Sequence, residues 1–225
     1  MKLEKMKLSL IIIIGSLTMG IVSCNKKGCT DPSALNYNKK YTKDDGSCTF
    51  EETTSNDGTI NKSGNIVSNE TWTSDKIYIL SGKVIVNSGV TLTIEPGTII
   101  KGAEGTGTLA SALVIAQGAK INAVGTASQP IIFTSVLDNI AVGQLTGTNL
   151  DENNQGLWGG IIMLGYAPIS AADGDVLSQI EGIPASDSYG AFGGSNTADN
   201  SGTLSYVSIR HGGALIGAGN EINGL

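Results

Sequence analysis

Residues 90–121 read VTLTIEPGTIIKGAEGTGTLASALVIAQGAKI and contain one phrase twice, an apolar alternation that a glycine turn closes. The copies are 21 positions apart, and four residue types recur at that offset: Leu92 and Leu113, Ile94 and Ile115, Gly97 and Gly118, Ile100 and Ile121. A period of two is typical of strands, and a fixed repeat of this size is typical of a solenoid. The stretch therefore predicts rungs of about 21 residues that stack about 4.8 Å apart, with Ile94 against Ile115.

The composition of the 225 residues favours β structure, since 31 are glycine, 5% are aromatic and 15% are charged. Threonine, serine, asparagine, isoleucine and valine fill most of the remainder, and these residues form strands and turns. Helix-length amphipathic patterns are scarce after residue 50, so we expect an all-β fold. The formal net charge of −6 disfavours nucleic acid as a partner.

The segment from Met1 to Cys24 has the order of an export signal. Three lysines precede the apolar run LSLIIIIGSLTMGIV, and Ser23 and Cys24 follow it. The stretch IVSC resembles the lipobox of bacterial lipoproteins, in which the peptidase cuts before a cysteine that then carries lipid. The resemblance implies a signal peptide over residues 1–23 and a lipidated Cys24, and a secretory signal with a chance cysteine is the alternative.

The two other cysteines, Cys29 and Cys48, remain as a pair if Cys24 carries lipid. A bond between them would close a loop of about 20 residues and contribute about 3 kcal/mol in the chain-entropy model. It would persist only outside the reducing cytoplasm. A metal site made of these thiols would lack further ligands, because the only histidine is the distant His211. We therefore expect a disulfide-stapled module within residues 24–49.

The segment CTDPSALNYNKKYTKDDGSC, residues 29–48, resembles a short cysteine-bounded module of exported Bacteroidetes proteins with the pattern C-x-D-P-x-A-x-N-Y…D-D-G-S-C. Its acids Asp31, Asp44 and Asp45 suit two alternative roles, as oxygen ligands for Ca²⁺ or as turn residues that cap backbone amides. Apart from that calcium ion, the sequence predicts no cofactor. Residues 50–66 are polar, lack apolar periodicity and are expected to form a linker.

The remaining chain resembles right-handed parallel β-helices of the pectin-lyase-like type, in particular β-helical lipoproteins and surface proteins of Bacteroidetes. The phrases that carry the resemblance are GVTLTIEPGTIIKG, LVIAQGAKINAVGTASQPIIFTS, GLWGGIIMLG and GTLSYVSIRHGG. It implies a β-helix over residues 67–225 and supplies the handedness. We interpret LVIA, KINA and PIIFTS as one rung, and we expect the next to begin at WGGIIML and close with LSYVSI. ALIGAGNEINGL starts another rung, so the chain is expected to be a fragment of a longer protein.

Two excursions, residues 136–157 and 165–203, interrupt the predicted stack. Such excursions leave a solenoid from its turns and gather on one side, which is often the binding side. Tolerated surface loops are the alternative. The excursions carry acidic residues that are candidate functional groups: Asp138, Asp151, Glu152, Asp173, Asp175, Glu181, Asp187 and Asp199.

Many β-helices of the type resembled cleave acidic polysaccharides. A lyase needs cations to neutralise a uronate, but after Lys120 the only basic residues are Arg210 and His211, against nine acids. These two residues are candidate catalytic groups, and a surface ion pair and a turn cap are their alternative roles. Their grouping with the acids at positions 151, 152, 173 and 175 within about 5 to 10 Å would favour catalysis. Trp158 is either a sugar-stacking platform or packed under a loop.

The sequence as a whole predicts a lipid-anchored envelope protein of the outer membrane, and which side of that membrane it faces is left open. We expect its β-helix to serve as a binding, adhesion or scaffolding surface, with a glycan or a surface protein as the partner. A β-helical lyase or glycoside hydrolase is the alternative, and the scarcity of basic side chains after Lys120 argues against it.

Overall fold

The computed structural model describes residues 26–50, 53–54, 58–171, 174–217, 220–221 and 224–225. Over these ranges the chain forms strands, two short 3-10 helices and no α-helix, which confirms the all-β class. The 3-10 helices are η1 (Gly107–Leu109) and η2 (Ser188–Gly190). The described chain contains no helix of the length and apolarity that crossing a membrane requires.

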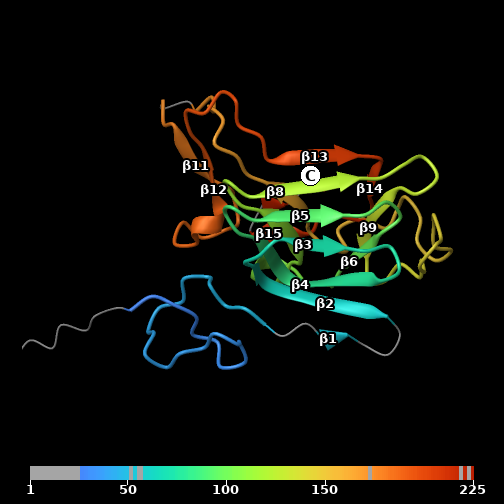
Figure 1. The fold of residues 1–225 in the computed structure, drawn as a ribbon, viewed down its shortest axis with the longest axis horizontal. Coiled ribbons are helices and arrows are strands. Elements are labelled where there is room, and N and C mark those ends of the chain that lie inside the picture. Colours follow the sequence, from blue (N-terminus) through green and yellow to red (C-terminus); the bar gives the residue numbers. More distant parts are fainter. Residues whose placement is uncertain (1–25, 51–52, 55–57, 172–173, 218–219, 222–223) are drawn as a thin grey trace, which may run out of the picture.

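The strands wind into a parallel β-helix with three faces (Figure 1). The first face stacks the first halves of β2 (Thr59–Ile66) and β4 (Ile77–Val86), then β6 (Ile99–Gly102), β9 (Ile131–Ser135) and β14 (Val207–Ile209). The second stacks the second halves of β2 and β4, then β7 (Ala112–Ile115) and β10 (Gly160–Met163). The third stacks β3 (Glu70–Trp72), β5 (Thr91–Ile94), β8 (Lys120–Val124) and β13 (Gly202–Ser205). Every pairing within the faces is parallel, as a solenoid requires.

Strands β2 and β4 each turn the corner between the first and second faces without a loop. Their pairing shifts register between Lys62 and Gly64. Gly64 and Gly82 have φ angles of 66° and 65° at these corners. Glycine adopts this left-handed conformation without a Cβ clash, so a single strand can serve two faces.

The spacing of successive rungs is not constant along the chain. Leu92 of β5 lies opposite Ile121 of β8, which is a step of 29 positions. Ile94 lies on the third face, in β5, whereas Ile115 lies on the second, in β7. The expected stacking of Ile94 on Ile115 is therefore wrong. The expected repeat of about 21 residues fits the earlier step, since Glu70 pairs with Leu92 and Ile77 with Ile99, each 22 positions on, but it does not hold for the next one.

Corners of unequal length explain this error. The two similar phrases are strands of different faces, and residues 103–111 add a loop between β6 and β7 that the tighter corners of β2 and β4 lack. The β-helix itself is shown by the parallel ladders and does not depend on the mispaired residues. Ile94 and Ile115 are both buried in one core, as the prediction of a shared apolar column required.

The strands expected over residues 113–135 are confirmed. LVIA, KINA and PIIFTS correspond to β7, β8 and β9, one on each face, and together they form one turn of the helix. β10 then stacks on β7, β13 on β8 and β14 on β9, as WGGIIML and LSYVSI predicted. Beyond β14, Gly224 forms a parallel bridge with Gly160 and so lies on the second face, one rung further along.

The core consists of columns of inward-facing side chains. On the first face Ile60, Tyr78, Ile100 and Phe133 follow one another in register, and none is more than 9% exposed. A fully buried side chain of this size contributes about 1.5–3 kcal/mol. Because each column is shared between neighbouring rungs, the stability of one rung depends on the next.

The expectation of a linker over residues 50–66 is wrong for its second half. Residues 59–66 form β2, which pairs with β4 and supplies the first rung. Ile60 and Ile66 are buried, but the residues between them are polar or glycine, so the strand shows no apolar alternation. β1 (Thr53–Thr54) adds an antiparallel strand at the outer edge of β2.

The two excursions leave from different corners, so the expectation that they gather at one side is wrong. Residues 136–159 connect the first face to the second, and residues 164–201 connect the second to the third. The second excursion contains the antiparallel hairpin of β11 (Leu177–Gln179) and β12 (Ala191–Gly193). A further hairpin, β15 (Leu215–Gly217) with β16 (Asn220–Glu221), follows β14.

Both excursions fold back over the outside of the solenoid. Ile140 packs on Ile99 and Ile132, which form a small apolar cluster outside the main core. Ile183 joins a second such cluster with Val114 and Ile162. The two excursions thus partly cover the outer surfaces of the first two faces, and their apolar contacts lie outside the main core.

Candidate functional site

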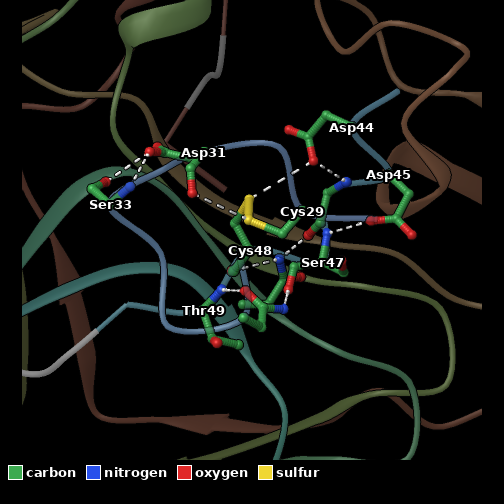
Figure 2. Close-up of a disulfide and its surroundings, with 11 residues drawn as sticks. Cys29, Asp31, Ser33, Asp44, Asp45, Ser47, Cys48 and Thr49 are labelled. Atoms are coloured by element: carbon green, nitrogen blue, oxygen red, sulfur yellow. Dashed lines mark hydrogen bonds between the residues drawn. A yellow bond between two sulfur atoms is a disulfide. The ribbon is translucent and has the colours of Figure 1, made fainter. Parts of the chain in front are cut away.

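The stapled module, residues 26–50, is built around a disulfide between Cys29 and Cys48 (Figure 2). The two cysteines are 1% and 8% exposed and pack with Ala34 and Phe50 in a cluster of their own. The predicted pairing is therefore present in the structure. Cys24, the residue expected to carry lipid, lies outside the described residues.

The three acids of the module cap turns, as one of their two predicted roles required. Asp31 Oδ1 accepts hydrogen bonds from the backbone amide of Ser33 at 2.9 Å and from its hydroxyl at 2.7 Å (Figure 2). Asp44 accepts the amide of Gly46, and Asp45 that of Ser47. The two bonds from Ser33 lower the pKa of Asp31, the backbone bond contributing most. In the described ranges no three His, Cys, Asp or Glu side chains are grouped to hold a metal ion.

Arg210 and His211 do not form a catalytic arrangement with a carboxylate. His211 has a φ of 58°, and its Nδ1 lies 2.6 Å from the carbonyl oxygen of Asn154. Arg210 Nε donates to the hydroxyl of Ser208 at 2.9 Å, and within the described residues no carboxylate oxygen lies within 4.0 Å of its guanidinium. His211 thus ties the first excursion to the corner after β14, and the ion pair expected for Arg210 is not found there.

Trp158 is packed rather than presented to a ligand. Its side chain is completely buried and stacks on Phe133 with ring centroids 6.5 Å apart. Its Nε1 donates to the carbonyl of Arg210 at 2.7 Å. A buried indole with a satisfied N–H is a structural anchor, so the sugar-stacking role considered for this residue is wrong.

The acids of the excursions mainly hold their own loops. Buried Asp138 accepts the amide of Ile140 at 3.0 Å, Asp199 accepts the amide of Tyr166 at 2.7 Å, and Asp151 accepts the amide of Asn153 at 2.9 Å. None of these bonds joins an acid to Arg210 or His211. Asp173 lies outside the described residues.

A polar cleft that the sequence did not predict opens between the module and the second excursion. Its volume is 420 Å³. Three separate parts of the chain line it: Asp45, Gly46 and Ser47 of the module; Asn65, Asn87, Ser88, Ala116 and Gln117 of the solenoid; and Tyr166, Ser188 and Tyr189 of the second excursion. We call this site the module cleft. A second cavity of 280 Å³ shares Gly46, Asn65 and Tyr189 with it, so the two adjoin.

One wall of the module cleft is pinned to the solenoid by Gln117. Its Nε2 donates to the carbonyls of Gly165 and Gly193 at 2.8 and 2.7 Å. Gly165 lies near the start of the second excursion, and Gly193 is the last residue of its strand β12. An amide that bridges the two strands of a loop fixes the direction in which the loop leaves the corner. Gln117 therefore helps to fix the positions of Tyr166 and Tyr189 in the cleft.

Tyr189 is the most perturbed titratable group of the cleft. Its hydroxyl donates to Asp187 Oδ2 at 3.1 Å. Burial raises the pKa of Tyr189 well above its ordinary value, and the negative charge of Asp187 raises it further. The phenol therefore stays protonated as a hydrogen-bond donor over the whole physiological range.

One lysine, Lys83, lines the adjoining cavity, and its ammonium group already donates to backbone carbonyls. Lys83 Nζ donates to the carbonyls of Thr108 and Ala110 at 3.2 Å each. Burial lowers the pKa of Lys83, and the charge of Asp187 opposes that shift. This lysine joins the corner loop to the second face and does not project into the module cleft.

A family model described as a pectate-lyase-like beta helix domain matches residues 64–225. The match begins within β2 and takes in every later strand, whereas the stapled module lies before it. No curated protein and no solved structure matches the chain significantly.

Proposed function

The chain belongs, through residues 64–225, to the pectate-lyase-like β-helix family, and from this premise we propose that it is a saccharide-binding protein of the cell envelope. The observation that carries the proposal is the module cleft, a site of 420 Å³ walled by two tyrosines and several amide and hydroxyl side chains. A volume of this order accommodates a small oligosaccharide segment.

The chemistry of the cleft suits a neutral sugar. Sugar hydroxyls both donate and accept, and so do the asparagine and glutamine amides and the serine and tyrosine hydroxyls. Tyr166 and Tyr189 also offer an apolar ring beside a polar tip, which matches the apolar faces of a pyranose ring. Among the residues described as lining the cleft, Asp45 is the only charged one. A uronate would meet a carboxylate there and no cation, so acidic glycans are disfavoured.

The envelope location rests on the segment that ends at Cys24. A basic stretch, an apolar run and the residues IVSC support export and attachment of lipid at this cysteine. Such an anchor, together with the module of Bacteroidetes type, supports the outer membrane of that lineage as the site of action. A surface glycan, or a glycosylated surface protein, is then the partner within reach.

Cleavage of a carbohydrate is the second candidate function, because the matched family model is pectate-lyase-like. A hydrolase of this kind needs two carboxylates on either side of the scissile bond. Asp31, Asp44, Asp138 and Asp199 instead accept hydrogen bonds from their own turns and loops. Binding without cleavage is the function that these contacts favour.

The test is a binding titration of the chain from Cys24 onward with neutral and uronate-containing oligosaccharides, accompanied by an assay for released reducing ends. We expect neutral sugars to bind, and Tyr166→Ala to weaken binding about tenfold. Tyr206→Ala, at an exposed tyrosine that does not line the cleft, is the matched control. Failure of all neutral sugars to bind, or equal losses in both variants, would refute the proposal. Turnover of any sugar would favour the enzyme.

A further inference from the structure

The stapled module reaches the solenoid mainly at one residue of the first rung. The backbone amide of Asn65 donates to the carbonyl of Cys48 at 3.2 Å. Its side-chain Nδ2 donates to the carbonyls of Gly46 and, at 3.3 Å, of Cys48. Asn65 thus donates one hydrogen bond to Gly46 and two to Cys48. These residues lie on either side of Ser47, and Gly46 and Ser47 line the cleft together with Asp45.

The neighbouring Gly64 shows how closely the module is seated. A Cβ on this glycine would lie 2.7 Å from the carbonyl oxygen of Cys48 and 3.0 Å from the ring of Phe50. Gly64 also forms an antiparallel bridge with Thr49. The module is therefore docked against β2 along its C-terminal segment.

The module has little else to hold its shape. Its apolar cluster contains Cys29, Ala34, Cys48 and part of Phe50, and it shares no residue with the main core of the solenoid. A miniature of this size depends on its disulfide, because so few apolar groups cannot offset the chain entropy alone. The main core of the solenoid, in contrast, contains no residue of the module.

From these contacts we propose that Asn65 is the positioning residue that seats the module as one wall of the cleft, and that the Cys29–Cys48 bond keeps that wall in the shape Asn65 binds. The saccharide affinity of the chain is then set from outside the β-helix. This inference rests on the proposed function for its ligand readout, but the docking of the module is measured without any ligand.

Hydrogen exchange and calorimetry of Asn65→Ala test the proposal. We expect exchange of the amides over residues 46–49 to become about tenfold faster and saccharide affinity to fall about tenfold. The melting temperature should stay unchanged when it is followed through Trp72 and Trp158, which are both buried in the solenoid. A general folding defect would lower the melting temperature as well, so faster exchange over residues 46–49 with an unchanged melting temperature identifies local undocking of the module.

Two further variants complete the test. Asn87→Ala removes the same type of side chain from the same cleft, but the described residues include no module group bonded to that side chain. It should weaken saccharide binding and leave exchange over residues 46–49 unchanged. The double variant Cys29→Ser, Cys48→Ser should show faster exchange over residues 29–49 and weaker binding, again with an unchanged solenoid melt.

The outcomes separate this inference from the function on which it rests. Unchanged exchange over residues 46–49 in Asn65→Ala, or in the double serine variant, would overturn the inference even if sugars bind. If the wild-type chain binds no sugar while Asn65→Ala still frees the module, the docking role is supported and the proposed function fails.

Discussion

Lys62 of β2 and Glu70 of β3 form a 2.7 Å ion pair within the first rung, with side chains that are 7% and 23% exposed. Glu70 Oε2 also accepts the indole N–H of Trp72 at 2.9 Å, and the ammonium of Lys62 lies 5.8 Å from the Trp72 ring. In the next rung the residues opposite the pair are Leu80 and Leu92. At the first rung the positions in register with Leu80 and Leu92 are thus filled by a paired charge.

Replacing Lys62 alone should destabilise the solenoid strongly. Lys62→Met leaves the partly buried carboxylate of Glu70 without its cation, which we expect to lower the free energy of unfolding by about 3 kcal/mol. Adding Glu70→Gln should recover part of that loss, because the amide oxygen still accepts from Trp72. Urea denaturation followed by tryptophan fluorescence measures both. Lys76→Met, which breaks the exposed pair with Asp75, is the control and should cost much less than Lys62→Met; an equal cost for the two single variants would contradict the prediction.

A methyl group at Gly102 should disturb the packing of Trp158. A Cβ there would lie 2.5 Å from Cε3 of the indole, and the ring is held by Phe133 and by its hydrogen bond to Arg210. We therefore expect Gly102→Ala to cost about 1–3 kcal/mol in thermal unfolding followed by circular dichroism. In a Trp158→Phe background the same change should cost less, since the smaller ring leaves room. Equal costs in the two backgrounds would show that the clash is not the cause.

The strands were predictable from sequence because their local pattern is strong. LVIA and PIIFTS are dense in branched residues, and a glycine turn or a polar turn bounds each of them. The register was not predictable in the same way. The connection between two faces varies in length from a single glycine such as Gly82 to the 136–159 excursion. Two similar sequence segments therefore need not lie on the same face. Strand β2 was missed because its two isoleucines, which are both buried, are its only large apolar residues.

The cleft was hidden from sequence reasoning because its walls are distant in the chain. Asn65 and Gln117 look like ordinary polar residues near turns, and nothing in their spacing indicates that one binds the module and the other the second excursion. Rarity drew attention instead to Arg210 and His211. His211 joins the first excursion to the corner after β14, and Arg210 bonds to Ser208 two residues before it. The module docks on the solenoid through tertiary contacts between distant segments, and local sequence periodicity does not indicate such contacts.

The first excursion should open when Lys101 is removed. Lys101 Nζ donates to the carbonyls of Asp138 and Ile140 at 2.7 and 2.8 Å, and the residue is only 8% exposed. Burial lowers the pKa of Lys101, and the charge of Asp138 partly offsets this. Lys101→Met leaves both carbonyls without this donor, at a cost of about 1–3 kcal/mol. Limited proteolysis should then cut residues 141–150 faster than in Lys120→Met, a control at an exposed lysine of the third face; equal rates would refute the role of Lys101.

The turn at the start of the module should loosen in acid. Hydrogen bonds from Ser33 hold the pKa of Asp31 below its ordinary value of 3.8. Because the folded pKa is depressed, the stabilisation is complete above pH 3.8 and is lost as the pH falls through the lower, folded pKa. Amide exchange at Ser33, corrected for its intrinsic pH dependence, should accelerate in that range. Asp31→Asn should abolish the acceleration at Ser33. Asp45→Asn is the control, because Asp45 caps a different turn by accepting the amide of Ser47, and it should preserve the acceleration. A pH-independent protection of Ser33 in the wild type would show that the carboxylate does not hold this turn.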